Sequence, residues 1–166
     1  MTYLLLKVIH VSAVVIFLGN IITGLFWMRH AKRSGDLQLI SHTMKGIIRS
    51  DRWFTIPGVI VILIGGFSSA IYAGIPILRT GWIFWSIVLF TVSGIVFSVK
   101  LIPLQQQIYK MTGNAADDKT NSFVWNEFEK KFNQWELWGA VALFAPLAAL
   151  VLMILKVPET TIFFKA

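Results

Sequence analysis

Residues 3–27 read YLLLKVIHVSAVVIFLGNIITGLFW, an apolar stretch whose only basic residues are Lys7 and His10. A helix needs about 20 apolar residues to cross the roughly 30 Å hydrocarbon core of a bilayer. Three further apolar stretches reach about that length, at residues 54–73, 82–104 and 137–155. The sequence therefore predicts an all-α fold, a four-helix transmembrane bundle in which residues 1–166 form a single integral membrane domain.

Composition agrees with a chain that is surrounded mostly by lipid. Hydrophobic residues make up 56% of the chain and charged residues 14%, whereas soluble domains carry about 25% charged residues. There is no cysteine, which excludes disulfides, thiolate metal sites and cysteine nucleophiles. The first apolar stretch is longer than the core of a signal peptide, and its basic cluster at residues 29–33 follows it, so we expect it to be retained as a true span.

Lysine and arginine are distributed unevenly among the connections. Eleven lie in the connections after the first and third spans, and four lie in the connection after the second span and at the two chain ends. Basic connections stay on the cytoplasmic side of a membrane, which predicts an N-out and C-out orientation. We expect the basic residues behind the net charge of +7 to contact anionic lipid headgroups. We predict no nucleic-acid partner.

The first cytoplasmic loop contains the pattern of a short amphipathic helix. Asp36 is placed to cap a helix that runs to about Arg49, and apolar residues recur on one of its faces at Leu37, Ile40, Met44 and Ile47. Such a helix either lies in the membrane interface or packs on the bundle, and the sequence leaves both alternatives open.

Small residues and isolated polar residues mark other positions on the spans. Gly58, Gly65, Ser69 and Ala73 share one face of the second span, where small side chains let helix backbones approach closely in lipid. The short connection at residues 74–81 predicts that spans two and three are antiparallel neighbours. Asn20 could form a hydrogen bond across helices. We interpret Asp51, at the start of the second span, as a helix cap or a partner of Arg49 or Arg52.

His10 is the candidate functional residue, because an ionisable group inside a membrane helix is a functional candidate by default. A neutral imidazole could ligate haem iron or copper, and the structural alternative is a histidine bonded to a neighbouring helix. His30 lies about 30 Å further along the same helix and His42 lies in the first loop, so neither can share a metal with His10. Met153 and Tyr72 match its depth and are possible second ligands, beside water or a histidine of another subunit.

Several motifs together resemble a family of uncharacterised bacterial predicted integral membrane proteins. They are YLLLKVIHVSAVVIFLGN from residue 3, SDRWFTIPGVIVILIGG from residue 50, TGWIFWSIVLF from residue 80, LIPLQQQIYKM from residue 101 and FAPLAALVLMILKVP from residue 144. The resemblance covers nearly the whole chain and is specific in order and spacing. It implies a multi-pass protein of the bacterial plasma (inner) membrane.

That family is in turn distantly similar to HemJ-type protoporphyrinogen oxidases and to CopD-type copper-resistance membrane proteins. The K-x-x-H setting of the HemJ proteins matches Lys7 and His10. The lysine that follows their Gly-Trp at the start of span three is absent here, because Gly81-Trp82 is followed by residues 83–86, which read IFWS. This departure removes the oxidase activity from what the resemblance implies and leaves haem or porphyrin binding.

Three functions therefore follow as hypotheses. The first is a redox protein that binds haem b or porphyrin through His10. The second is a non-catalytic membrane subunit, as a homo-oligomer or with a membrane partner held at the small-residue face of span two. The third is an accessory protein of a metal or small-molecule transporter. The sequence does not decide whether the protein is an enzyme.

Overall fold

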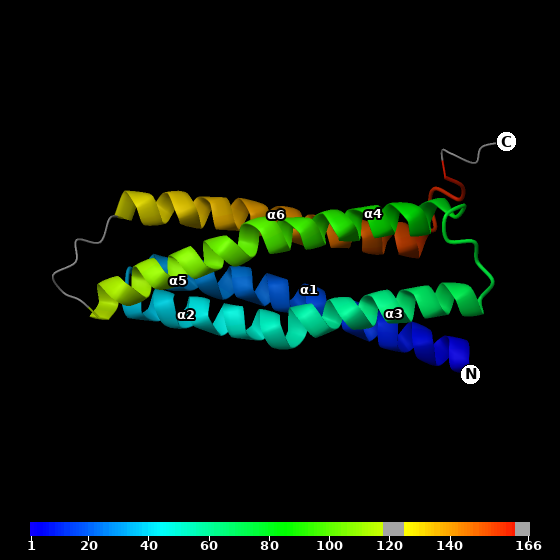
Figure 1. Cartoon of the computed structure of the whole chain (residues 1–166), viewed down its shortest axis with the longest axis horizontal. Coiled ribbons are helices and arrows are strands. Elements are labelled where there is room, and N and C mark those ends of the chain that lie inside the picture. Colours follow the sequence, from blue (N-terminus) through cyan, green and yellow to red (C-terminus); the bar gives the residue numbers. More distant parts are fainter. Residues whose placement is uncertain (118–124, 162–166) are drawn as a thin grey trace.

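The computed structural model describes residues 1–117 and 125–161, almost all of which are helical. Two short π-helical turns, η1 (Asp51–Thr55) and η2 (Phe97–Leu101), join helices into longer rods. The six α-helices are α1 (Thr2–Ser34), α2 (Leu37–Ser50), α3 (Ile56–Tyr72), α4 (Gly81–Val96), α5 (Ile102–Asp117) and α6 (Trp125–Leu155). Four rods result: α1, α2–η1–α3, α4–η2–α5 and α6 (Figure 1).

Each of the four rods is long and apolar enough to cross a membrane, which confirms the predicted four-span fold. With the third rod counted from Gly81 to Ala115, they contain 33, 36, 35 and 31 residues, or about 46–54 Å of helix, so each extends beyond a hydrocarbon core of about 30 Å. Both described chain ends lie at one end of the bundle, and the α1–α2 turn lies at the other (Figure 1). We call these the terminal end and the basic end.

Each π turn precedes an Ile-Pro pair, and the two features are connected. Proline has no N–H and its ring crowds the carbonyl of the preceding helical turn. The N–H of Ile56 bonds to the carbonyl of Asp51, and the N–H of Ile102 bonds to the carbonyl of Phe97, as in a π-helix. The wider turns thus carry the helix without a break up to Pro57 and Pro103.

Helix α2 packs on the bundle and does not lie flat in the membrane interface. The carboxylate of Asp36 accepts hydrogen bonds from the backbone N–H groups of Gln38 and Leu39, which confirms the predicted cap. Ile40 and Met44 are fully buried, because the apolar face of α2 packs against α1 and α5. Of the two alternatives left open for this helix, the structure therefore has the packed one.

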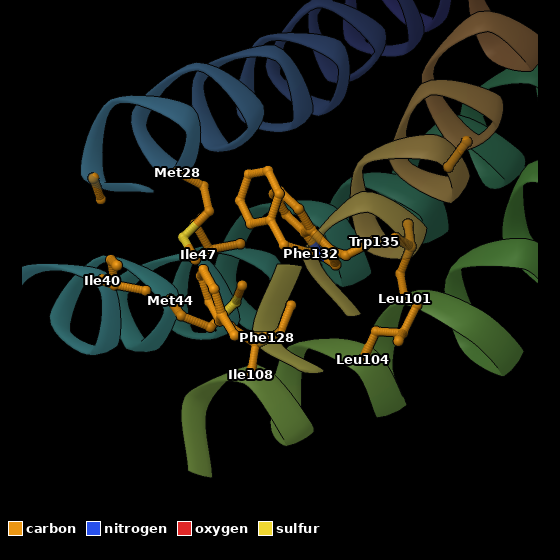
Figure 2. Close-up of a cluster of buried hydrophobic side chains, with 12 residues drawn as sticks. Met28, Ile40, Met44, Ile47, Leu101, Leu104, Ile108, Phe128, Phe132 and Trp135 are labelled. Carbon is orange, nitrogen blue, oxygen red and sulfur yellow. The ribbon is translucent and has the colours of Figure 1, made fainter. Parts of the chain in front are cut away.

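A dense apolar core holds the basic end together (Figure 2). It joins α1, α2, α5 and α6 through the side chains of Met28, Ala31, Ile40, Met44, Ile47, Leu101, Leu104, Ile108, Phe128, Phe132, Trp135 and Ala142. Ion pairs between α1 and α6 flank this core, from Arg29 to Glu136 and from Lys32 to Glu129. The Nζ atom of Lys32 also lies 4.4 Å from the centre of the Phe132 ring.

Helix α5 is longer than the sequence suggests. The stretch 112–122 is rich in polar and small residues, a composition that predicts a loop. Residues 112–117 are helical, so the prediction is wrong for them. Residues 118–122 lie outside the described residues. Thr112 is fully buried and its hydroxyl donates to the carbonyl of Ile108. Because the Thr112 hydroxyl is satisfied within its own helix and neighbouring side chains cover it, Thr112 does not interrupt the helix.

At the terminal end the helices form two pairs, α1 with α3 and α4 with α6. A Cβ atom built on Gly58 would lie 3.7 Å from the Cβ of Phe17, so the small-residue face of α3 does permit close approach, to α1 of the same chain. In the second pair, the hydroxyls of Ser86 and Ser93 donate to the carbonyls of Ala149 and Ala142.

The prediction that spans two and three are packed neighbours is wrong. Helices α3 and α4 run antiparallel, but each makes its main contacts with another helix (Figure 1). The short connection between them sets their direction only. The chain after α6 is tied to this connection, because the N–H of Gly81 donates to the carbonyl of Glu159 and the N–H of Thr161 donates to the carbonyl of Arg79.

We predict that Met44→Ala lowers the free energy of unfolding by about 2–5 kcal/mol, since it opens a cavity in the core of the basic end. Leu39→Ala, on the exposed face of the same helix, should cost about 1 kcal/mol or less. Unfolding of the full chain in mixed micelles with increasing dodecyl sulfate measures both. Equal losses for the two variants would contradict the packing of α2.

Candidate functional site

His10 is held by a hydrogen bond to the neighbouring helix. Its Nδ1 atom lies 2.8 Å from the backbone carbonyl oxygen of Ile62 on α3. A carbonyl only accepts, so Nδ1 carries a proton, and in the neutral form of the ring the lone pair is on Nε2. The structural alternative for His10 is thus present in the fold, and the same bond leaves the second ring nitrogen with a lone pair for a ligand.

Two consecutive glycines on α3 make room for this histidine. A Cβ atom on Gly65 would lie 3.2 Å from the Cβ and 3.4 Å from the Cα of His10. A Cβ atom on Gly66 would lie 3.0 Å from the Cε1 and 3.2 Å from the Nδ1 of the imidazole. Any larger residue at either position would push α1 or the ring away from Ile62, so the glycine pair sets the position of the imidazole.

His10 lines a cavity of about 380 Å³ between the α1–α3 pair and the α4–α6 pair. Most of the lining is aliphatic or aromatic and comes from all four membrane helices. Toward the basic end the cavity meets an apolar cluster in which the rings of Phe17 and Phe90 lie 5.6 Å apart. The connection after α3 contributes Ile75 and Ile77 at the terminal end.

Few polar groups line this cavity, and the lysine and arginine side chains among them are Lys7 and Lys156, with no described carboxylate beside them. The hydroxyls of Ser69 and Ser86 donate to backbone carbonyls, whereas Lys7 and Lys156 line the cavity beside His10. In residues 1–117 and 125–161, neither lysine forms an ion pair, and no described carboxylate lines the cavity. An apolar ligand that carries a negative charge fits this combination.

The structure brings together His10 and one of its two predicted co-ligands. Met153 lines the same cavity. Tyr72 is 61% exposed, its ring stacks on Tyr3 at 6.5 Å, and it does not line the cavity. His30 and His42 are exposed residues toward the basic end, and neither lines the cavity that contains His10. The described residues contain no group of three metal-ligating side chains.

A second polar site was missed in the sequence. The interpretation of Asp51 as a helix cap or an arginine partner is wrong, because its carboxylate is buried, with 8% of the residue exposed. It accepts hydrogen bonds from Asn20 Nδ2 at 3.0 Å, Thr55 Oγ1 at 2.8 Å and Gln105 Nε2 at 2.8 Å. The predicted cross-helix bond of Asn20 is confirmed. A signal was present in Thr55, four residues after Asp51 on the same helical face.

Four apolar rods and a cavity between two helix pairs define a multi-pass integral membrane protein. Residues 4–157 match the model of DUF2269, a family described as predicted integral membrane proteins, and the chain belongs to this family. The family membership expected from the motifs is thereby confirmed. Comparisons with curated proteins and with solved structures gave no match.

We predict that Gly66→Ala displaces the His10 ring and lowers the free energy of unfolding by about 1–3 kcal/mol, because the added methyl overpacks the contact. Gly19→Ala is the matched control, since nothing lies within 4 Å of a Cβ at that helical position; it should be neutral or stabilising by up to about 1 kcal/mol. Nitrogen NMR of labelled histidine reports the bond at Nδ1. An unchanged Nδ1 resonance in Gly66→Ala would contradict the conclusion that the glycine pair sets the position of the imidazole.

Proposed function

We propose that this protein binds haem b or a related porphyrin in the cavity and acts as a membrane redox protein, with Nε2 of His10 as the axial ligand. The observation that carries the proposal is the hydrogen bond from His10 Nδ1 to the carbonyl of Ile62, inside an apolar cavity. A hydrogen bond from the other ring nitrogen to a backbone carbonyl fixes the tautomer of a metal-ligating histidine and raises its basicity.

The donor set supports haem more than a free copper ion. The described residues offer His10, with Met153 in the same cavity, and no group of three metal-ligating side chains. A porphyrin brings four nitrogen ligands of its own, so one protein ligand is enough to hold its iron. The cavity volume of about 380 Å³ lies within the range of about 300–1,000 Å³ that is usual for small-molecule sites.

The two lysines suit the carboxylates of a porphyrin. Lys7 lies one helical turn from His10 on α1, and Lys156 follows α6 on the opposite side of the cavity. Both can neutralise propionate groups while the apolar lining contacts the macrocycle and excludes water. The bound iron would supply one-electron redox chemistry, and Met153 would be its second protein ligand.

The same proposal includes the orientation and the lipid contacts. Lys45 and Arg49 of α2 and Arg52 of η1 are exposed and lead to the exposed Trp53. Basic side chains beside an interfacial tryptophan suit the cytoplasmic face and its anionic headgroups. We therefore assign the basic end to the cytoplasm and the terminal end to the outside of a bacterial inner membrane.

Purified full-length protein should show a Soret band, either as extracted or after titration with haemin. His10→Ala should lose that band, because the axial nitrogen is gone, whereas His30→Ala and His42→Ala should keep it. Absorbance spectra of the four proteins at equal concentration decide the point. A wild-type protein that binds no haemin, or a His10→Ala variant with an unchanged spectrum, would disprove the function.

The role of the lysines can be measured separately. The double variant Lys7→Gln/Lys156→Gln should bind haemin more weakly, by about 1.5- to 5-fold for each exposed ion pair that is lost. The control variant Lys45→Gln should bind haemin as the wild type does. The dimethyl ester of haemin has no carboxylates, so its affinity should be the same for the wild type and the double variant. A loss of affinity for the ester would show that the lysines act through the fold and not through the propionates.

A further inference from the structure

We propose that Asp51 is the centre of a binding site for one monovalent cation, H⁺ or Na⁺, enclosed by α1, η1 and α5. The site is distinct from the cavity. Asn20 lies ten residues from His10 on α1, and the cluster that contains Phe17, Leu18 and Ile62 lies between them. The inference does not depend on whether the cavity binds a porphyrin.

Three elements contribute side chains to the carboxylate. Asn20 of α1 and Thr55 of η1 donate to Oδ1, and Gln105 of α5 donates to Oδ2. Asn20 also donates to the hydroxyl oxygen of Thr55 at 2.9 Å. Gln105 is 4% and Thr55 is 2% exposed, whereas Asn20 is partly exposed, so the group is largely buried.

The buried charge of this site has no counter-ion among the described residues. Asn20, Thr55 and Gln105 are neutral, and none of the ion pairs in the described chain includes Asp51. The basic residues nearest along the surrounding elements are all exposed; they are Arg49 and Arg52 of its own rod, Lys100 of η2, Lys110 of α5 and Arg29 of α1. No titratable group therefore faces the carboxylate from any of these elements.

An unpaired buried carboxylate destabilises the folded state even after the protein relaxes around it. Hydrogen bonds from neutral donors offset part of this cost, and uptake of one positive charge removes most of the rest. A single carboxylate matches a single charge, whereas Ca²⁺ is bound by six to eight oxygen ligands that commonly include several carboxylates.

The side chains can serve either cation. A proton would bind to one carboxylate oxygen, and a half-turn of the terminal amide of Asn20 or Gln105 would let the amide oxygen accept that O–H. For Na⁺, a half-turn of each terminal amide exchanges its nitrogen for its oxygen. The two carboxylate oxygens, the Thr55 hydroxyl and the two amide oxygens then form an oxygen-only set of ligands, which hard cations prefer.

The position of the site connects both π turns. Asp51 begins η1, and Gln105 lies one helical turn after η2. Single π turns inside α-helices occur frequently at functional sites. The bond from Gln105 to Asp51 therefore joins η1 to the rod that contains η2.

Thermal unfolding of the full-length protein in uncharged detergent tests the site. Sodium chloride replaces choline chloride at constant ionic strength, at several pH values. If Na⁺ binds, the Tm of the wild type rises with sodium concentration. If the proton binds, sodium has no effect, and the Tm advantage of the wild type over Asp51→Asn falls as the pH rises, because a proton held only by the folded state stabilises it more at low pH.

Asp51→Asn should lose the response, since an amide keeps the shape but cannot take up the cation as a carboxylate does. Asp36→Asn is the matched control, because Asp36 is an exposed cap carboxylate, and it should keep the wild-type response. The proposal is overturned if Asp51→Asn and the wild type respond identically to sodium and to pH. A wild-type Tm that changes with neither sodium nor pH overturns it without any variant.

Discussion

The need to satisfy backbone hydrogen bonds inside lipid governs this fold. Unpaired N–H and C=O groups cost several kcal/mol each in the hydrocarbon core, so a chain can cross it only as continuous helix or as a closed barrel. Proline at positions 57 and 103 would break that continuity, and the π turns η1 and η2 precede both prolines with bonds that reach five residues back. Four continuous helical rods are the result, and their side chains form the core of the basic end, the cavity and the Asp51 site.

The two ends of these rods are packed differently, and the candidate site depends on the difference. At the basic end, α1, α2, α5 and α6 share one apolar core. At the terminal end, the same rods separate into two pairs with a cavity between them. The core of the basic end thus joins rods that also line the cavity, although the core and the cavity lining share no residue.

The sequence predicts what depends on local chemistry and misses what depends on distant partners. Apolar length revealed the four spans, and Asp36 followed by an apolar helical face revealed α2. His10 was identified as a candidate because a single imidazole stands out in an apolar span. Asp51 was not recognised, because its partners Asn20 and Gln105 lie 31 and 54 residues away. The pairing of α3 with α1 was also missed, since a short connection reveals direction and not the neighbour.

The separation of α3 from α4 has a consequence for how a ligand would reach the cavity. These helices line opposite walls without packing on each other, so lipid completes the side between them, while the connection after α3 and the chain after α6 bound the terminal end. Acyl chains or detergent tails then compete for the same apolar space. The concentration that the cavity experiences is that of the ligand dissolved in the bilayer, and an affinity expressed per litre of water includes the partition of the ligand into the membrane.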